Sequence, residues 1–163
     1  MGMTLFKIKW HLGAILKTAV YKLAFGKDFS VGKDTTFRSR FNVYLEKGAK
    51  ISIGEKCFFN NDCSINALDS IVIGNGNIFG ENVKLYDHNH RYQDHNVSLK
   101  EQGFVTKPIV IGNDCWFGSN VTVLQGVHIG NNCVIGANSL IYKDIEDGSI
   151  VTSDSKITVR KKS

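Results

Sequence analysis

Closely spaced cysteine pairs are missing from this 163-residue chain, and their absence argues against a zinc site. Such sites usually take cysteines two to four residues apart, whereas the four cysteines here are Cys57, Cys63, Cys115 and Cys133. We expect each to be a small buried thiol. No secretory signal is visible, so we expect no disulfides and take a reducing cytoplasm as the default location.

A long uninterrupted apolar run is also lacking. Lys7, Lys9, His11 and Lys17 interrupt the apolar N-terminal stretch, so we expect neither a membrane span nor a cleavable signal core there. Charge of one sign is in small excess, with a net charge of +5. A mildly basic chain suits an anionic partner such as a nucleotide, a phosphate or a lipid surface. No recognition-helix, RNA-binding or zinc-finger pattern is present, so we expect no nucleic-acid binding.

What the chain does have is a six-residue repeat. Residues 111–146 read as IGNDCW, FGSNVT, VLQGVH, IGNNCV, IGANSL and IYKDIE. The first position is always large and apolar, and the fifth is small or aliphatic. No helix has a period of six, whereas short strands joined by tight corners do. The same repeat occurs less regularly over residues 31–48, 53–70 and 73–90.

Three hexapeptides close one triangular coil, and coils stack because their backbone hydrogen bonds run between coils. We therefore predict an all-β parallel β-helix of about five coils, covering residues 29–147, with a long protruding loop at 91–107 and a basic tail at 148–163. Gly and Asn tolerate left-handed or bridging backbone. We expect the corners to be formed by Gly112, Gly118, Gly130, Gly136, Asn113, Asn131 and Asn132.

Residues 1–28 are predicted to form an amphipathic helix and its end. Apolar residues recur at three- and four-residue steps at Leu5, Ile8, Leu12, Ile15, Ala19 and Leu23, and Gly26 is a plausible stop. Two interpretations remain open. The helix caps an open end of the prism or packs on a neighbouring subunit, or residues 3–25 make weak contact with an anionic membrane surface.

Two segments resemble a known family. They are PIVIGNDCWFGSNVTVLQGVHIGNNCVIGANSLIYKDI, which begins at Pro108, and NVKLYDHNHRY, which begins at Asn82. Both resemble the hexapeptide-repeat acyltransferases, in particular the branch of galactoside, maltose, nodulation-factor and streptogramin O-acetyltransferases. The resemblance covers roughly residues 50–147 and implies a left-handed coil.

The resemblance implies transfer of an acetyl group from acetyl-CoA, the co-substrate, to a sugar hydroxyl. That hydroxyl needs a general base, for which histidine is suited. The family's histidine falls on His90, and His88, two residues away, is the alternative. Direct transfer in a ternary complex implies neither an acyl-enzyme nor a metal. Asp87 and Asp94 are both near enough in sequence to orient the imidazole of His90.

The resemblance also implies binding residues. For the acceptor they are Asn60, Asp69 and Tyr86. For the coenzyme they are Trp116, Gly118, Ser119, Ala137, Tyr142, Lys143 and Lys156. The family usually ends this region with a turn containing Gly and Pro, which SDSKITVRK lacks, so the last phosphate contact falls on Lys156 or Arg160.

The family implies a homotrimer with active sites between subunits, acting on a small-molecule or glycan acceptor. We expect the protein in the cytoplasm, with peripheral contact on the inner face of the membrane if the helix meets lipid. The main alternative is N-acetylation of a nucleotide-linked amino sugar. A more remote alternative is a gamma-type carbonic anhydrase, because the five-residue spacing of His90 and His95 is suggestive of metal ligands. The last alternative is a structural prism without catalytic activity.

Overall fold

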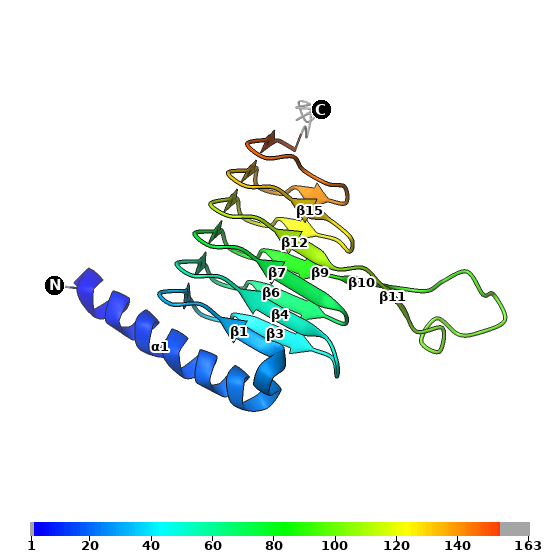
Figure 1. Cartoon of the computed structure of the whole chain (residues 1–163), viewed down its shortest axis with the longest axis horizontal. Coiled ribbons are helices and arrows are strands. Elements are labelled where there is room, and N and C mark those ends of the chain that lie inside the picture. Colours follow the sequence, from blue (N-terminus) through cyan, green and yellow to red (C-terminus); the bar gives the residue numbers. More distant parts are fainter. Residues whose placement is uncertain (1, 154–163) are drawn as a thin grey trace, which may run out of the picture.

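The structure is a computed structural model that describes residues 2–153, with side chains from residue 10 onward. A three-sided prism occupies most of it, a helix lies across one end, and a hairpin projects from one corner (Figure 1). The helix α1 (Gly2–Phe25) is followed by the short 3-10 helix η1 (Gly26–Asp28). No helix in residues 2–153 is long and apolar enough to cross a bilayer.

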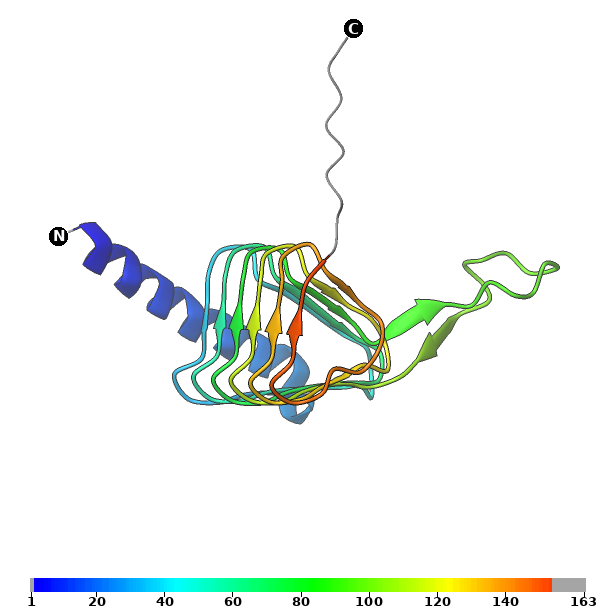
Figure 2. The same ribbon diagram turned by 90° about the horizontal axis from the view of Figure 1, so that it is seen from above.

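Three parallel sheets form the faces of the prism, as Figure 2 shows down its axis. The first face contains β1 (Phe29–Val31), β4 (Lys50–Ile53), β7 (Ser70–Ile73), β12 (Ile109–Ile111) and β15 (His128–Ile129). The second contains β2 (Thr36–Phe37), β5 (Phe58–Phe59), β8 (Ile78–Phe79), β13 (Trp116–Phe117), β16 (Val134–Ile135) and β18 (Ile150–Val151). The third contains β3 (Asn42–Leu45), β6 (Ser64–Ala67), β9 (Lys84–Tyr86), β14 (Thr122–Val123) and β17 (Leu140–Ile141).

Five coils are complete, and a sixth begins with a bridge between Ile129 and Ile145 and continues into β18. The prediction of a left-handed β-helix of about five coils is confirmed. Backbone hydrogen bonds join successive coils as predicted. For example, the Trp116 amide donates to the Cys133 carbonyl at 2.9 Å. The last strand, β18, lies beyond residue 147, the predicted end of the repeat.

The first and fifth repeat positions fill the axis of the prism. All six first-position side chains from Ile111 to Ile141 are at most 3% exposed. Four phenylalanines of the second face point inward, and Phe79 stacks between Phe59 and Phe117 with ring centroids 4.3 and 4.6 Å apart. The four cysteines are buried and free, as predicted. The six-residue period therefore identified the core correctly.

The glycines at the corners have a different role from the predicted one. None of the four glycines expected at corners has a positive φ. A Cβ at Gly118 would lie 2.5 Å from the Ala137 backbone nitrogen, so glycine is required there by the close approach of the next coil. Positive φ occurs at Asn132, as predicted, and also at residues such as Asn120 and Asn138. Asn113 and Asn131 use their side-chain oxygens to accept backbone hydrogen bonds from the neighbouring coil.

Helix α1 caps the open end of the prism and ends just before Gly26, which has a φ of 58°. The face that packs is not the predicted apolar stripe. Ala14 is 3% exposed, and Tyr21 packs against Phe29 and Phe41 of the first coil. By contrast, Leu23 of the predicted stripe is 89% exposed. The aromatic side chains at the end of the prism pack against the opposite side of the helix.

Candidate active site

The predicted catalytic histidines lie on a hairpin that leaves the prism between the third and fourth coils. Strands β10 (His88–His90) and β11 (Phe104–Thr106) pair antiparallel, with His88 opposite Thr106 and His90 opposite Phe104. The predicted loop is thus partly regular. We call the corner from which it projects, formed by residues 68–69, 87, 124–127 and 142–144, the hairpin corner (Figures 1 and 2).

Asp87 anchors the base of the hairpin and is completely buried. Its two carboxylate oxygens accept hydrogen bonds from the amides of Leu68 and Asp69, both at 2.8 Å. Its backbone carbonyl accepts one from the Lys107 amide at 2.9 Å, where the chain returns to the prism. The carboxylate thus ties the second coil to the start of the hairpin, and the carbonyl ties that start to its end.

The imidazole of His88 contacts this buried carboxylate. Its Nδ1 lies 3.2 Å from Oδ1 of Asp87, and its side chain is only 18% exposed. The rings of Tyr86 and Phe104 lie nearly perpendicular to it, with centroids 6.1 and 5.4 Å away. An imidazole that donates from Nδ1 to a carboxylate has Nε2 as its acceptor in the neutral form. Asp87 is one of the two residues that the sequence placed within reach of His90, but in the structure its carboxylate contacts His88.

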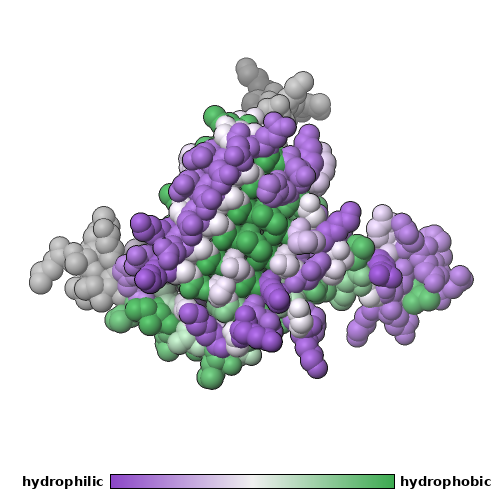
Figure 3. Space-filling model, in the orientation of Figure 1, coloured by the Kyte–Doolittle hydropathy of each residue, from purple (hydrophilic) through white to green (hydrophobic). Residues whose placement is uncertain are grey.

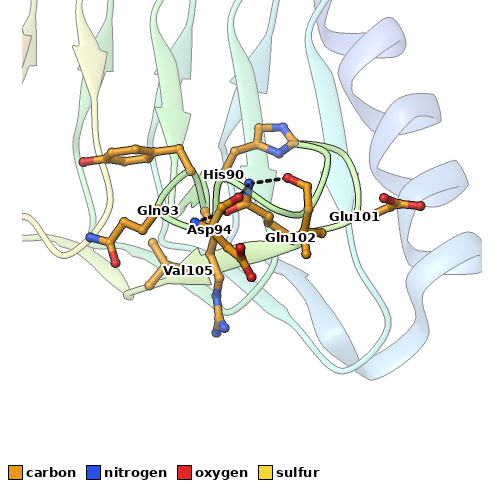
Figure 4. Close-up of a pocket in the computed structure, with 9 residues that line it drawn as sticks. His90, Gln93, Asp94, Glu101, Gln102 and Val105 are labelled. Carbon is orange, nitrogen blue, oxygen red and sulfur yellow. Dashed lines mark hydrogen bonds between the residues drawn. The ribbon is translucent and has the colours of Figure 1, made fainter.

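His90 is more open to solvent. Its ring packs beside Phe104, with centroids 4.4 Å apart, and lines a cavity of about 460 Å³. Residues of β10, β11 and their connecting loop form this cavity (Figure 4). Gln102 holds the loop in shape: its amide donates to the Asp94 and Val97 carbonyls, and its oxygen accepts from the Asp94 amide. The hydrogen-bonded loop therefore forms one wall of the cavity, beside the exposed imidazole of His90.

The predicted acceptor residues do not form one group. Asp69 and Tyr86 lie at the hairpin corner, close to His88. Asn60 follows β5 at the other end of the third face, below the corner of residues 80–82, 118–120 and 136–138, which we call the Asn corner. Its side-chain oxygen already accepts hydrogen bonds from Arg38 and the Asn61 amide, both at 2.9 Å. Asn60 therefore lies a face away from the histidines of its own chain.

Arg38 follows β2, the first strand of the second face, and the sequence did not predict it as a site residue. Its guanidinium lies 4.3 Å from the Trp10 ring centroid and 5.2 Å from that of Phe58. A hollow of about 200 Å³ adjoins these three side chains. No spacing in the sequence connects residue 10 of the helix with residue 38, which follows β2, and residue 58 of β5, so only the fold brings them together.

The predicted coenzyme residues are also divided between the two corners. Gly118, Ser119 and Ala137 lie at the Asn corner, where the Asn138 amide donates to the Ser119 carbonyl at 2.9 Å. Trp116 is 54% exposed on the second face, just before that corner. Tyr142 (68% exposed) and the exposed Lys143 lie at the hairpin corner, across the third face. Lys156 lies outside the described residues.

The thiols are poor candidates for an acyl carrier. Burial raises the pKa of Cys63 and of Cys115 to about 11, and it raises the pKa of Cys57 as well. Cys63 donates to the Gly80 carbonyl at 3.1 Å, and Cys115 to the Gly130 carbonyl at the same distance. A thiol without a thiolate form near neutral pH and without access to solvent is a weak nucleophile. Within residues 2–153, no three His, Cys, Asp or Glu side chains gather as a metal site would require.

Comparison with known proteins assigns the repeat. Residues 108–143 match the family model described as the hexapeptide repeat of succinyl-transferase. The galactoside O-acetyltransferase of Escherichia coli is 37% identical over 63% of this chain and 50% of its own length. These likenesses support a hexapeptide-repeat acyltransferase. It spans between about a third and two thirds of the length of the first curated relatives that it matches.

Two further similar proteins bear on the site. A Vibrio cholerae hexapeptide-repeat acetyltransferase, solved in complex with acetyl coenzyme A, is 28% identical with a TM-score of 0.69, covering 84% of this chain and 71% of its own. A putative lipopolysaccharide biosynthesis O-acetyl transferase of Escherichia coli is 26% identical over 53% of this chain and 59% of its own length. These likenesses agree with the fold, and the arrangement of side chains at the site shows what chemistry it can support.

Proposed function

We propose that the protein transfers an acetyl group from acetyl-CoA to a hydroxyl of a sugar or glycan. The observation that carries the proposal is the exposed imidazole of His90, beside a cavity of about 460 Å³ on a hexapeptide prism. The coenzyme of the Vibrio relative and the galactoside acceptor of the Escherichia coli relative, as their names state, support the two substrates. The lipopolysaccharide relative supports a surface polysaccharide or its lipid-linked precursor as the acceptor class.

His90 acts as the general base in this proposal. Its neutral imidazole takes the hydroxyl proton while the acceptor oxygen attacks the thioester carbonyl carbon. Backbone amides near Ser119 donate to the oxyanion of the tetrahedral intermediate. When the carbon–sulfur bond breaks, the imidazolium returns the proton to the departing thiolate. The acetyl ester and free coenzyme A leave, and His90 is neutral again.

His88 is the alternative base, because its Nδ1 contacts the buried carboxylate of Asp87. We assign the reaction to His90 since its ring lines the cavity, whereas the His88 side chain is largely covered. Asp87 and His88 are then positioning residues. They hold the base of β10, and with it the direction in which the ring of His90 points.

A homotrimer would complete the site. The proposed catalytic group and the coenzyme group at the Asn corner lie at opposite edges of the third face, as described above. If prisms pack side by side, the hairpin corner of one subunit meets the Asn corner of its neighbour. Apolar side chains project outward on the second face and supply a contact surface, at Phe58, Ile78, Trp116, Val134 and Ile150.

The experiment measures coenzyme A release from acetyl-CoA with sugar acceptors. We expect His90→Ala to lower kcat about 10²–10⁴-fold with little change in coenzyme affinity, because only proton transfer is lost. His88→Ala should have a smaller effect. Near-normal turnover in His90→Ala together with a large loss in His88→Ala would move the base to His88.

The same assay separates the acceptor classes. Under this proposal a sugar hydroxyl is acetylated, and the product is an ester that mild alkali hydrolyses. An alkali-stable product that forms only with a nucleotide-linked amino sugar would instead establish the N-acetyltransferase alternative. The absence of acetyl transfer to every acceptor from a folded protein that binds acetyl-CoA would contradict the proposal as a whole.

A further inference from the structure

Helix α1 uses only one side to cap the prism. Ala14 is buried against the first coil, and the Tyr21 hydroxyl donates to the Phe41 carbonyl at 3.0 Å. Lys17 donates to the same carbonyl from Nζ at 3.3 Å. These contacts fix the rotation of the helix about its axis. The orientation of every other helical position relative to the prism follows from it.

The opposite side of α1 is apolar and uncovered. At 100° per residue, five large side chains fall on the side facing away from Ala14, Lys17 and Tyr21. Between 53% and 89% of each is exposed, and we call them the outer strip: Leu12, Ile15, Leu16, Val20 and Leu23. Figure 3 shows apolar side chains along the lower margin of the molecule, over α1. A contiguous apolar strip of this size on a surface helix calls for a partner.

Charge indicates which partner. Residues 2–25 contain four lysines and no aspartate or glutamate. Lys22 is exposed in the last turn of the helix, and Lys27 follows it. Lys47 and Lys50 lie beside Lys27 and Asp28 around one hollow at this end of the prism, where three lysines outnumber one carboxylate. An apolar strip bordered by lysines matches the interfacial region of an anionic bilayer, which offers acyl chains below negative headgroups.

The geometry allows flat contact. The helix lies across the end of the prism, so the outer strip forms the extremity of the molecule there (Figure 1). We propose that the outer strip of α1 rests in the surface of an anionic lipid bilayer and holds the prism upright on it. One helix of this kind binds weakly. In the trimer of the proposed function, three helices at the same end would face one plane and bind with greater avidity.

The test is co-sedimentation of the full chain with vesicles of phosphatidylcholine, with and without phosphatidylglycerol. We expect binding to the anionic vesicles and at least tenfold weaker binding to the neutral ones. Leu23→Glu should weaken binding to anionic vesicles at least about tenfold, because it removes a leucine that lipid would bury and adds repulsion from the negative headgroups. Leu99→Glu, the same change on the hairpin loop, should bind normally. Lys22→Gln should weaken binding about fivefold.

Three results would overturn this proposal: equal binding to both vesicle types, normal binding by Leu23→Glu, or a smaller oligomer in Leu23→Glu. The last would show that a second copy of the chain covers the strip. Circular dichroism of each variant checks that it is folded. Acetyl transfer to a soluble acceptor should be unchanged in Leu23→Glu, so failure of membrane binding and failure of the proposed reaction are distinguishable.

Discussion

The prism and helix α1 are both rich in apolar residues, yet they use them differently. In the prism, each apolar repeat position faces the axis, and its environment is set by the coil above and the coil below. In α1, apolar residues occur on two sides, and only the side carrying Ala14 and Tyr21 is packed. A closed coil has a single interior in which its apolar side chains can be buried, whereas a helix with two apolar sides can pack through either of them. The predictions below test this contrast.

The largest effect is expected inside the prism. Phe79→Ala removes the middle ring of the Phe59–Phe79–Phe117 stack and leaves a cavity that neighbouring coils cannot fill without breaking their hydrogen bonds. The free energy of unfolding should fall by about 3–5 kcal/mol, as urea denaturation would measure. Val72→Ala, on the outward side of the same coil, is the control and should cost under about 1 kcal/mol. Equal losses would contradict the assignment of inside and outside.

The buried thiols make the stability of the same interior depend on pH. The pKa of Cys63 and of Cys115 is raised to about 11 from 9.0, because burial disfavours the thiolate. Above pH 9 the unfolded chain loses these protons while the folded chain keeps them. Stability therefore falls as pH rises from 9 to 11, by on the order of 2 kcal/mol for Cys63. Cys63→Ala should reduce the slope in thermal unfolding over that range, and an unchanged slope would argue against the burial.

The smallest effect is expected on the helix. Tyr21→Phe removes one hydrogen bond to the Phe41 carbonyl from the packed side of α1. It should lower the free energy of unfolding by about 0.5–1.5 kcal/mol. Leu16→Ala, on the outer strip, should change it by less than about 0.5 kcal/mol in the absence of lipid. A larger loss for Leu16→Ala than for Tyr21→Phe would show that the wrong side of the helix had been taken as packed.

The candidate site was predictable in part. The tight spacing of His88 and His90 and the break after residue 90 located the hairpin, and resemblance named its histidines. The contact between Asp87 and His88 was not predicted, because it depends on the amides of Leu68 and Asp69 in the preceding coil. The environment of Arg38 was missed for the same kind of reason: Trp10 and Phe58 reach it from other elements.

The sequence by itself determined the prism: a period of six repeats one local geometry, so the inward side chains and the number of coils follow from counting along the chain. Tertiary structure alone decided how α1 is rotated and what surrounds each histidine. Those outcomes depend on residues far apart in sequence, whose side chains compete for the same space only after the coils have stacked. Local periodicity carries no information about that competition.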